Sequence, residues 1–165
     1  MKATSRLFSF ALFALLFTSC GEKKGVAETE SALPTWQDGD IILTYERTPC
    51  FGRCPHFEFT VWGSGKCRYV GKNFVDRLGS FSGKIDVREL ETIFSKAREI
   101  GYENFESVYD NRMVTDLPSV STGIWLSDSL QTVRNRYKGP QEIQTIYPLF
   151  DQLVESIEWN KLEDN

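Results

Sequence analysis

The sequence predicts an α+β domain in which an antiparallel sheet carries two helices on one face. Three observations support this fold class: runs of alternating apolar and polar residues, two stretches with helical spacing, and short glycine-containing links between the runs. The elements follow in the order β4-α-β2-α. Because the links between consecutive strands are too short for parallel crossovers, we expect antiparallel pairing throughout.

Four strands are expected in the first half of the domain. Residues 41–46 and 57–62 alternate between apolar and polar side chains, and Gly63-Ser64-Gly65 is a hairpin signal that leads into residues 66–70. A weaker fourth strand is expected from Leu78 to Ile85.

A helix is expected to begin after Asp86. This residue can cap the first turn with Glu89 three positions on, and Gly101 is a stop signal. The apolar residues between them form one stripe that would pack against the sheet: Val87, Leu90, Ile93, Phe94, Ala97 and Ile100.

The second half repeats the pattern after a stretch, residues 102–118, with little periodicity. Residues 120–126 and 130–137 are expected to form a hairpin around a Ser127-Asp128-Ser129 turn. The last helix begins at Gly139-Pro140, and Pro148 should kink or divide it.

The N-terminus has the pattern of an export signal. Lys2 and Arg6 precede an apolar run from Leu7 to Phe17, and small residues then lead to Cys20, as in a bacterial lipobox. We expect residues 1–19 to be a cleaved signal peptide, and residues 20–39 to be a lipidated cysteine, carrying acyl chains such as palmitate, followed by a flexible tether. Residues 40–165 would form a single domain. The alternative is an ordinary signal peptide that is cut nearby.

The net charge limits the classes of partner that the mature chain can bind. Removal of residues 1–19 leaves 17 basic and 23 acidic side chains, a net charge of −6, which argues against nucleic acid. We expect a protein anchored by its N-terminal lipid in the bacterial cell envelope, at the outer membrane on its periplasmic or surface side. Its partner would be a protein or a small-molecule ligand.

The most informative segment is the turn from Arg47 to Pro55. Pro49 and Pro55 disfavour helix, and Gly52 lets the backbone fold back between the two cysteines. We therefore predict a Cys50–Cys54 disulfide, which would stabilise the domain by about 2 kcal/mol. A pairing of Cys67 with either cysteine is the alternative to a reduced, buried Cys67.

Chemical roles for the turn remain open alternatives. Cys50, Cys54, His56 and Cys67 supply a ligand set that zinc accepts, and Arg47 and Arg53 could activate a thiol for redox chemistry. The spacing is irregular for both. We therefore expect no cofactor, no metal and no catalytic residue, and a non-catalytic interaction domain whose functional turn includes Arg47, Phe51, Gly52 and Arg53.

The pattern Arg-x-x-Cys-Phe-Gly-x-Cys-Pro between two strands resembles a family of small bacterial envelope domains of unknown function. The resemblance extends from Asp40 to Trp159 and includes Asp-x-Pro at residues 116–118 and Ile-Glu-Trp at residues 157–159. It implies an exported protein or lipoprotein without an established activity, and it transfers no catalytic residue. Cys67 lies outside the motif, which supports the pairing of Cys50 with Cys54.

Overall fold

The computed structural model describes residues 33–163. The expected signal peptide, Cys20 and most of the expected tether lie outside these residues. Within residues 33–163, no helix has both the length and the apolar character needed to cross a membrane.

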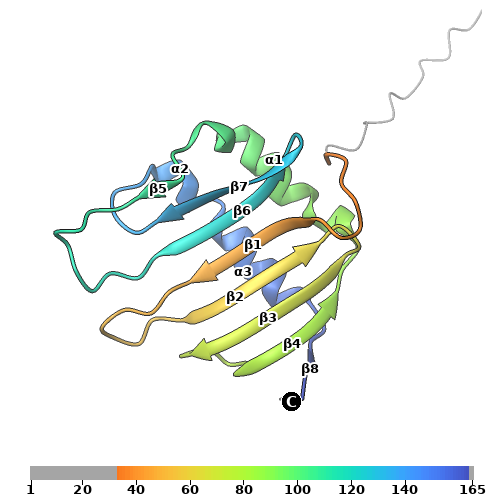
Figure 1. Cartoon of the computed structure of the whole chain (residues 1–165), viewed down its shortest axis with the longest axis horizontal. Coiled ribbons are helices and arrows are strands. Elements are labelled where there is room, and N and C mark those ends of the chain that lie inside the picture. The colour runs from red at the N-terminus through yellow and green to blue at the C-terminus, as the bar shows by residue number, and fades with distance from the viewer. Residues whose placement is uncertain (1–32, 164–165) are drawn as a thin grey trace, which may run out of the picture. The chain divides into compact units, whose positions relative to one another are not determined.

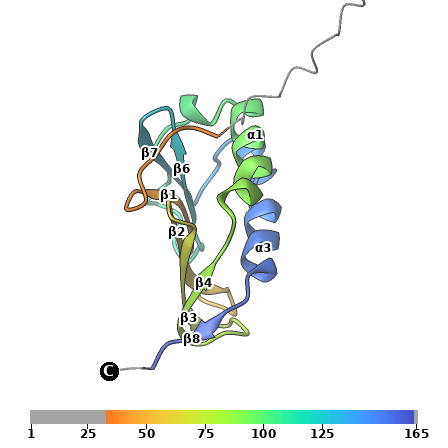
Figure 2. The same ribbon diagram turned by 90° about the vertical axis from the view of Figure 1, so that its right-hand side faces the viewer.

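The described chain forms one mixed sheet with helices on a single face. The sheet has eight strands in the order β5-β7-β6-β1-β2-β3-β4-β8 (Figure 1). Figure 2 shows helices α1 and α3 on one side of the sheet. The strands are β1 Ile41–Arg47, β2 His56–Trp62, β3 Lys66–Asn73, β4 Gly79–Lys84, β5 Val108–Tyr109, β6 Val120–Leu126, β7 Ser129–Asn135 and β8 Asn160–Lys161; the helical segments are η1 Val87–Leu90, α1 Glu91–Glu99, η2 Tyr102–Asn104, α2 Gln141–Gln144 and α3 Tyr147–Ser156.

The predicted all-antiparallel sheet with the order β4-α-β2-α is wrong. Two further strands, β5 and β8, extend the sheet at its two edges, and β5 runs parallel to β7. Each is only two residues long, too short to carry a period of alternation. β5 follows the helices rather than a hairpin, so no tight turn forces it to run antiparallel to its neighbour.

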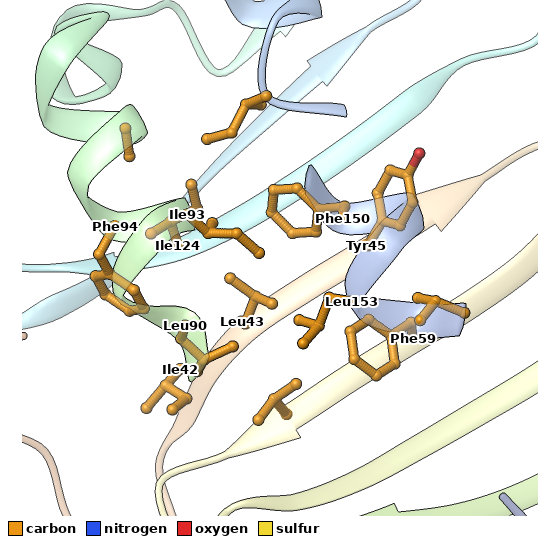
Figure 3. Close-up of a cluster of buried hydrophobic side chains, with 14 of the residues drawn as sticks. Ile42, Leu43, Tyr45, Phe59, Leu90, Ile93, Phe94, Ile124, Phe150 and Leu153 are labelled. Atoms are coloured by element: carbon orange, nitrogen blue, oxygen red, sulfur yellow. The ribbon is translucent and has the colours of Figure 1, made fainter. Parts of the chain in front are cut away.

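The core lies between the sheet and the two longer helices. Alternation along β1 and β2 directs Leu43, Tyr45 and Phe59 toward the helices, where all three are buried. Side chains from both helices meet this layer from the other side, as Figure 3 shows for Ile93, Phe94, Phe150 and Leu153. Burial of each such side chain stabilises the fold by roughly 1.5–3 kcal/mol.

Two local expectations for the helices are confirmed. Asp86 forms a capping box with Glu89 and starts the 3₁₀ turn η1, from which α1 continues. Pro148 lies in the first turn of α3, and the predicted last helix is divided into α2 and α3 just before it. Figure 1 shows α3 behind the middle of the sheet, and the chain continues from its end to β8.

Candidate ligand pocket beside the cysteine turn

Residues 48–55, here called the cysteine turn, link β1 to β2. The Sγ atoms of Cys50 and Cys54 are 1.95 Å apart and the Cα atoms 5.7 Å apart, so the two residues that the sequence pairs are bonded in the structure. The Gly52 amide donates to the Cys50 Sγ atom over 3.2 Å. A short covalent ring therefore closes this bend.

The base of the cysteine turn is tied to the strand entry of β6. The Thr48 amide donates to the Ser119 carbonyl over 3.0 Å, and the Ser119 amide donates to the Thr48 hydroxyl over 2.7 Å. The tip is free of such contacts: the Phe51 side chain is 92% exposed. The Arg53 guanidinium lies over the Phe74 ring, 5.7 Å from its centroid, and so links the turn to the loop between β3 and β4.

Arg47 does not belong to the exposed surface of the turn. Its Nε donates to the Tyr45 hydroxyl over 2.8 Å, and its terminal nitrogen contacts both Asp151 carboxylate oxygens, at 2.9 and 3.2 Å. The Tyr45 hydroxyl donates to Asp151 over 2.8 Å. Burial, with the Asp151 charge beside it, raises the pKa of Tyr45, so the hydroxyl remains a donor. Through these hydrogen bonds, Tyr45, Arg47 and Asp151 connect α3 to β1.

A pocket of about 250 Å³ lies beside the cysteine turn. Its walls come from the end of the turn, the inner face of β2 and β3, the loop of residues 74–78, and α3. The lining residues are Pro55, Phe57, Tyr69, Phe74, Val75, Asp76, Arg77, Asp151, Val154 and Glu155.

The loop between β3 and β4 is held in place by close backbone contact and by an ion pair. A Cβ atom at Gly71 would lie 1.7 Å from the Arg77 carbonyl oxygen, so only glycine lets the loop fold back this closely. Arg77 donates to both carboxylate oxygens of Glu155 on α3, over 3.0 and 2.8 Å. These bonds lower the pKa of Glu155 and keep it ionised. The loop and the helix therefore form fixed walls.

Tyr69 supplies a polar group that faces the pocket. Its side chain is 3% exposed, yet its hydroxyl makes no hydrogen bond to any of residues 33–163. Burial raises the pKa of Tyr69 to about 12, and the charges that act on it belong to Arg77, Glu155 and Asp76. All three line the pocket, so the hydroxyl lies at the pocket too. It stays protonated and can both donate and accept a hydrogen bond.

The positions of the cysteines support neither the alternative disulfide of Cys67 nor the zinc site. Cys67 pairs with Val61 across β2 and β3, five residues along β2 from His56, or roughly 17 Å at the rise of a strand. It is a buried free thiol, and burial raises its pKa to about 12. The alternative disulfide of Cys67 with Cys50 or Cys54 is therefore wrong, and the set Cys50, Cys54, His56 and Cys67 is not brought together. In the part of the chain that the structure describes, no three His, Cys, Asp or Glu side chains are placed to hold a metal ion.

Sequence reasoning missed the residues that line the pocket. Tyr69, Asp76 and Glu155 come from a strand, a loop and a helix, and no spacing along the chain joins them. One signal was present: Gly71 and Gly79 bracket a short loop that contains Phe74, Val75, Asp76 and Arg77. Glycines at both ends of such a loop indicate a close approach of backbone to backbone.

A larger, shallower hollow of about 630 Å³ lies elsewhere and includes Thr44, Glu46, Glu58, Thr60 and Arg134 in its lining. Glu58 is engaged by Lys72 in an ion pair. The buried polar side chains in its lining, Tyr45 and Thr122, are both hydrogen-bonded. The pocket beside the cysteine turn is therefore the better candidate site.

Comparison with protein families identifies the family of this chain. It belongs to the family described as domain of unknown function (DUF6438), which is matched over residues 41–154. The match includes the cysteine turn and every residue that lines the pocket except Glu155. No match was found among curated proteins or among solved structures. Any function must therefore be argued from the site itself.

Proposed function

We propose that the protein is a lipid-anchored binding protein of the bacterial cell envelope. Two features support the location: the basic and apolar segments that precede Cys20, and the Cys50–Cys54 bond. Disulfides form and persist in oxidising compartments such as the periplasm and the cell surface. After cleavage, acyl chains on Cys20 would hold the domain at the membrane.

The domain binds a ligand without transforming it, and the ligand occupies the pocket beside the cysteine turn. The observation that carries this proposal is Tyr69, whose side chain is 3% exposed and whose hydroxyl faces the pocket without a hydrogen-bond partner in residues 33–163. A bound molecule that displaces solvent from the pocket can give this hydroxyl a hydrogen bond, which contributes about 0.5–1.5 kcal/mol. Ligand sites are typically apolar hollows with a few such polar groups.

The anchor is tested by metabolic labelling with an alkyne analogue of palmitate. We expect the full-length protein to take up the label and to partition with membranes, and Cys20→Ser to lose both properties. Cys67→Ser is the matched control and should label like the parent. Equal labelling of the parent and Cys20→Ser would contradict the lipid anchor.

The binding site is tested by identifying small molecules that co-purify with the protein from its own membranes. Val75→Trp would fill the pocket, whereas Val108→Trp places the same ring on an exposed position of β5. We expect at least one compound to be enriched with the parent and with Val108→Trp and to be absent from Val75→Trp. No enriched compound, or the same compounds with all three proteins, would overturn the proposal.

A further inference from the structure

We propose that the ligand of the pocket beside the cysteine turn is a small organic ammonium ion with an apolar body. This inference rests on the proposed binding function of the pocket and adds the chemical class of its ligand.

The two polar groups of the pocket that lack a partner can both accept hydrogen bonds, so we expect a ligand that donates them. Asp151 is engaged by Arg47, and Glu155 is engaged by Arg77. Asp76, by contrast, makes no hydrogen bond or ion pair within residues 33–163, and neither does the Tyr69 hydroxyl. An ionised carboxylate can only accept hydrogen bonds, and a phenol can accept one as well. An ammonium group carries three donors and can serve both groups at once.

The charge balance of the pocket favours a cation over an anion. Asp76, Asp151 and Glu155 line it, together with one guanidinium, that of Arg77. Asp151 and Glu155 are each paired with a guanidinium, which leaves the exposed Asp76 as the lining carboxylate without an ion-pair partner in residues 33–163. The Arg53 guanidinium lies on the Phe74 ring, 5.7 Å from its centroid. A carboxylate or phosphate ligand would therefore meet the like charge of Asp76, while the guanidinium in the lining, that of Arg77, is already engaged by Glu155.

The remaining walls suit an apolar body next to the charge. The Phe57 and Tyr69 rings stack with centroids 5.3 Å apart, and Phe74, Val75 and Val154 complete the apolar lining. Aromatic faces attract organic cations as well as apolar groups. The pocket volume of about 250 Å³ is many times the roughly 10–15 Å³ that one water molecule needs, so a small organic body fits.

The ligand class is tested with three probes of similar size and different charge. Phenethylammonium, 2-phenylethanol and phenylacetate are titrated into the full-length protein in a non-ionic detergent, with binding followed by calorimetry. We expect phenethylammonium to bind at least about tenfold more tightly than 2-phenylethanol, because a charge-assisted hydrogen bond is about twice as strong as a neutral one. Phenylacetate should not bind measurably.

Two variants locate the binding within the pocket. Tyr69→Phe keeps the ring and removes the hydroxyl, and Asp76→Asn removes the charge while keeping the shape. Each should weaken phenethylammonium binding by about fivefold or more. The matched controls are Tyr137→Phe, and Asp128→Asn at the opposite end of the sheet; both should bind like the parent.

The outcomes separate this inference from the proposed function. Equal binding of 2-phenylethanol, or tighter binding of phenylacetate, that is lost in Tyr69→Phe would overturn the ammonium class and leave the pocket as a binding site. Binding that neither pocket variant changes would overturn the inference as well. If no probe binds and no compound co-purifies with the parent, both the inference and the proposed function fail.

Discussion

Tyr69 and Tyr102 are both buried, but their hydroxyls meet different surroundings. The Tyr102 hydroxyl lies 2.8 Å from both the Thr122 carbonyl and the Thr122 hydroxyl, whereas that of Tyr69 has no partner within the described chain. Removal of a hydroxyl that stabilises the fold should lower the free energy of unfolding. Removal of a hydroxyl that serves only a ligand should leave that free energy unchanged.

This contrast gives a test on the ligand-free protein. Tyr102→Phe should lower the free energy of unfolding by about 1–2 kcal/mol, because it leaves the Thr122 groups unpaired. Tyr69→Phe should leave it unchanged within about 0.5 kcal/mol or raise it slightly. Urea denaturation of both variants measures the difference. A loss of similar size in Tyr69→Phe would assign its hydroxyl to the fold rather than to a ligand.

The Cys67 thiol should make the free energy of unfolding fall as the pH becomes alkaline. Burial, and secondarily the Glu89 charge, raise the pKa of this thiol from 9.0 to about 12 in the folded state. The unfolded chain therefore loses its proton first, so the stabilising contribution is complete below pH 9.0 and is lost as pH rises toward 12. Burial also raises the pKa values of Tyr45, Tyr69 and Tyr102, which adds to the same trend.

A Cys67→Ala variant isolates the thiol from the tyrosines. Between about pH 9 and pH 11, the parent should lose roughly 2 kcal/mol more unfolding free energy than Cys67→Ala does. Denaturant titrations of both proteins across this range give the two slopes. Parallel slopes would show that the thiol titrates alike in the folded and unfolded chains.

At the scale of elements, the loop between β3 and β4 depends on the absence of a side chain at Gly71. Gly71→Ala would place a Cβ atom 1.7 Å from the Arg77 carbonyl oxygen, so the loop must move away from β3. We expect a loss of about 2–4 kcal/mol in unfolding free energy, together with loss of phenethylammonium binding.

Gly39 provides the control for this substitution, because a Cβ atom there would meet nothing within 4 Å. Gly39→Ala should change stability by no more than about 0.5 kcal/mol and should leave binding intact. If Gly71→Ala behaved in the same way in thermal and binding measurements, the loop would not be the fixed wall described above.

The sequence predicts elements with strong local signals better than it predicts the sheet. Alternation marks β1, β2 and β3, a capping box marks the helix start at Asp86, and Pro148 marks the break between α2 and α3. β5 and β8 have two residues each and are defined by their partners in the sheet rather than by their own residue types. Their direction and place could not be predicted, because pairing at an edge depends on where the rest of the chain lies.

At the scale of the whole molecule, the Cys50–Cys54 bond closes a very short loop. Its contribution should therefore be modest, about 2 kcal/mol, since the entropy removed from the unfolded chain grows with loop length. The double variant Cys50→Ser, Cys54→Ser should fold and should have a correspondingly lower unfolding free energy. A reducing agent should lower the unfolding free energy of the parent by the same amount and leave that of the double variant unchanged. If reduction did not change the parent, the Cys50–Cys54 disulfide would be contradicted.

The cysteine turn could be predicted from the sequence because its residues are contiguous, whereas the pocket beside it could not. Four segments meet there: Pro55 to Phe57, Tyr69, the loop of residues 74–77, and the face of α3 with Asp151, Val154 and Glu155. The first three follow one another along the chain, whereas Glu155 is 78 residues beyond Arg77. The hairpin of β2 and β3 is expected from the sequence, but only the tertiary fold brings α3 across it. A site of this kind is a property of the tertiary structure.

The most direct test of the ligand pocket observes the Tyr69 hydroxyl itself. Carbon-13 labelling at the ring carbon that bears the hydroxyl gives one NMR signal for each of the six tyrosines, and Tyr69→Phe identifies the signal of Tyr69. On addition of phenethylammonium to the full-length protein, we expect the Tyr69 signal to shift and saturate while those of Tyr102 and Tyr137 stay in place. A Tyr69 signal that does not move, or that moves together with all the others, would contradict a ligand site beside the cysteine turn.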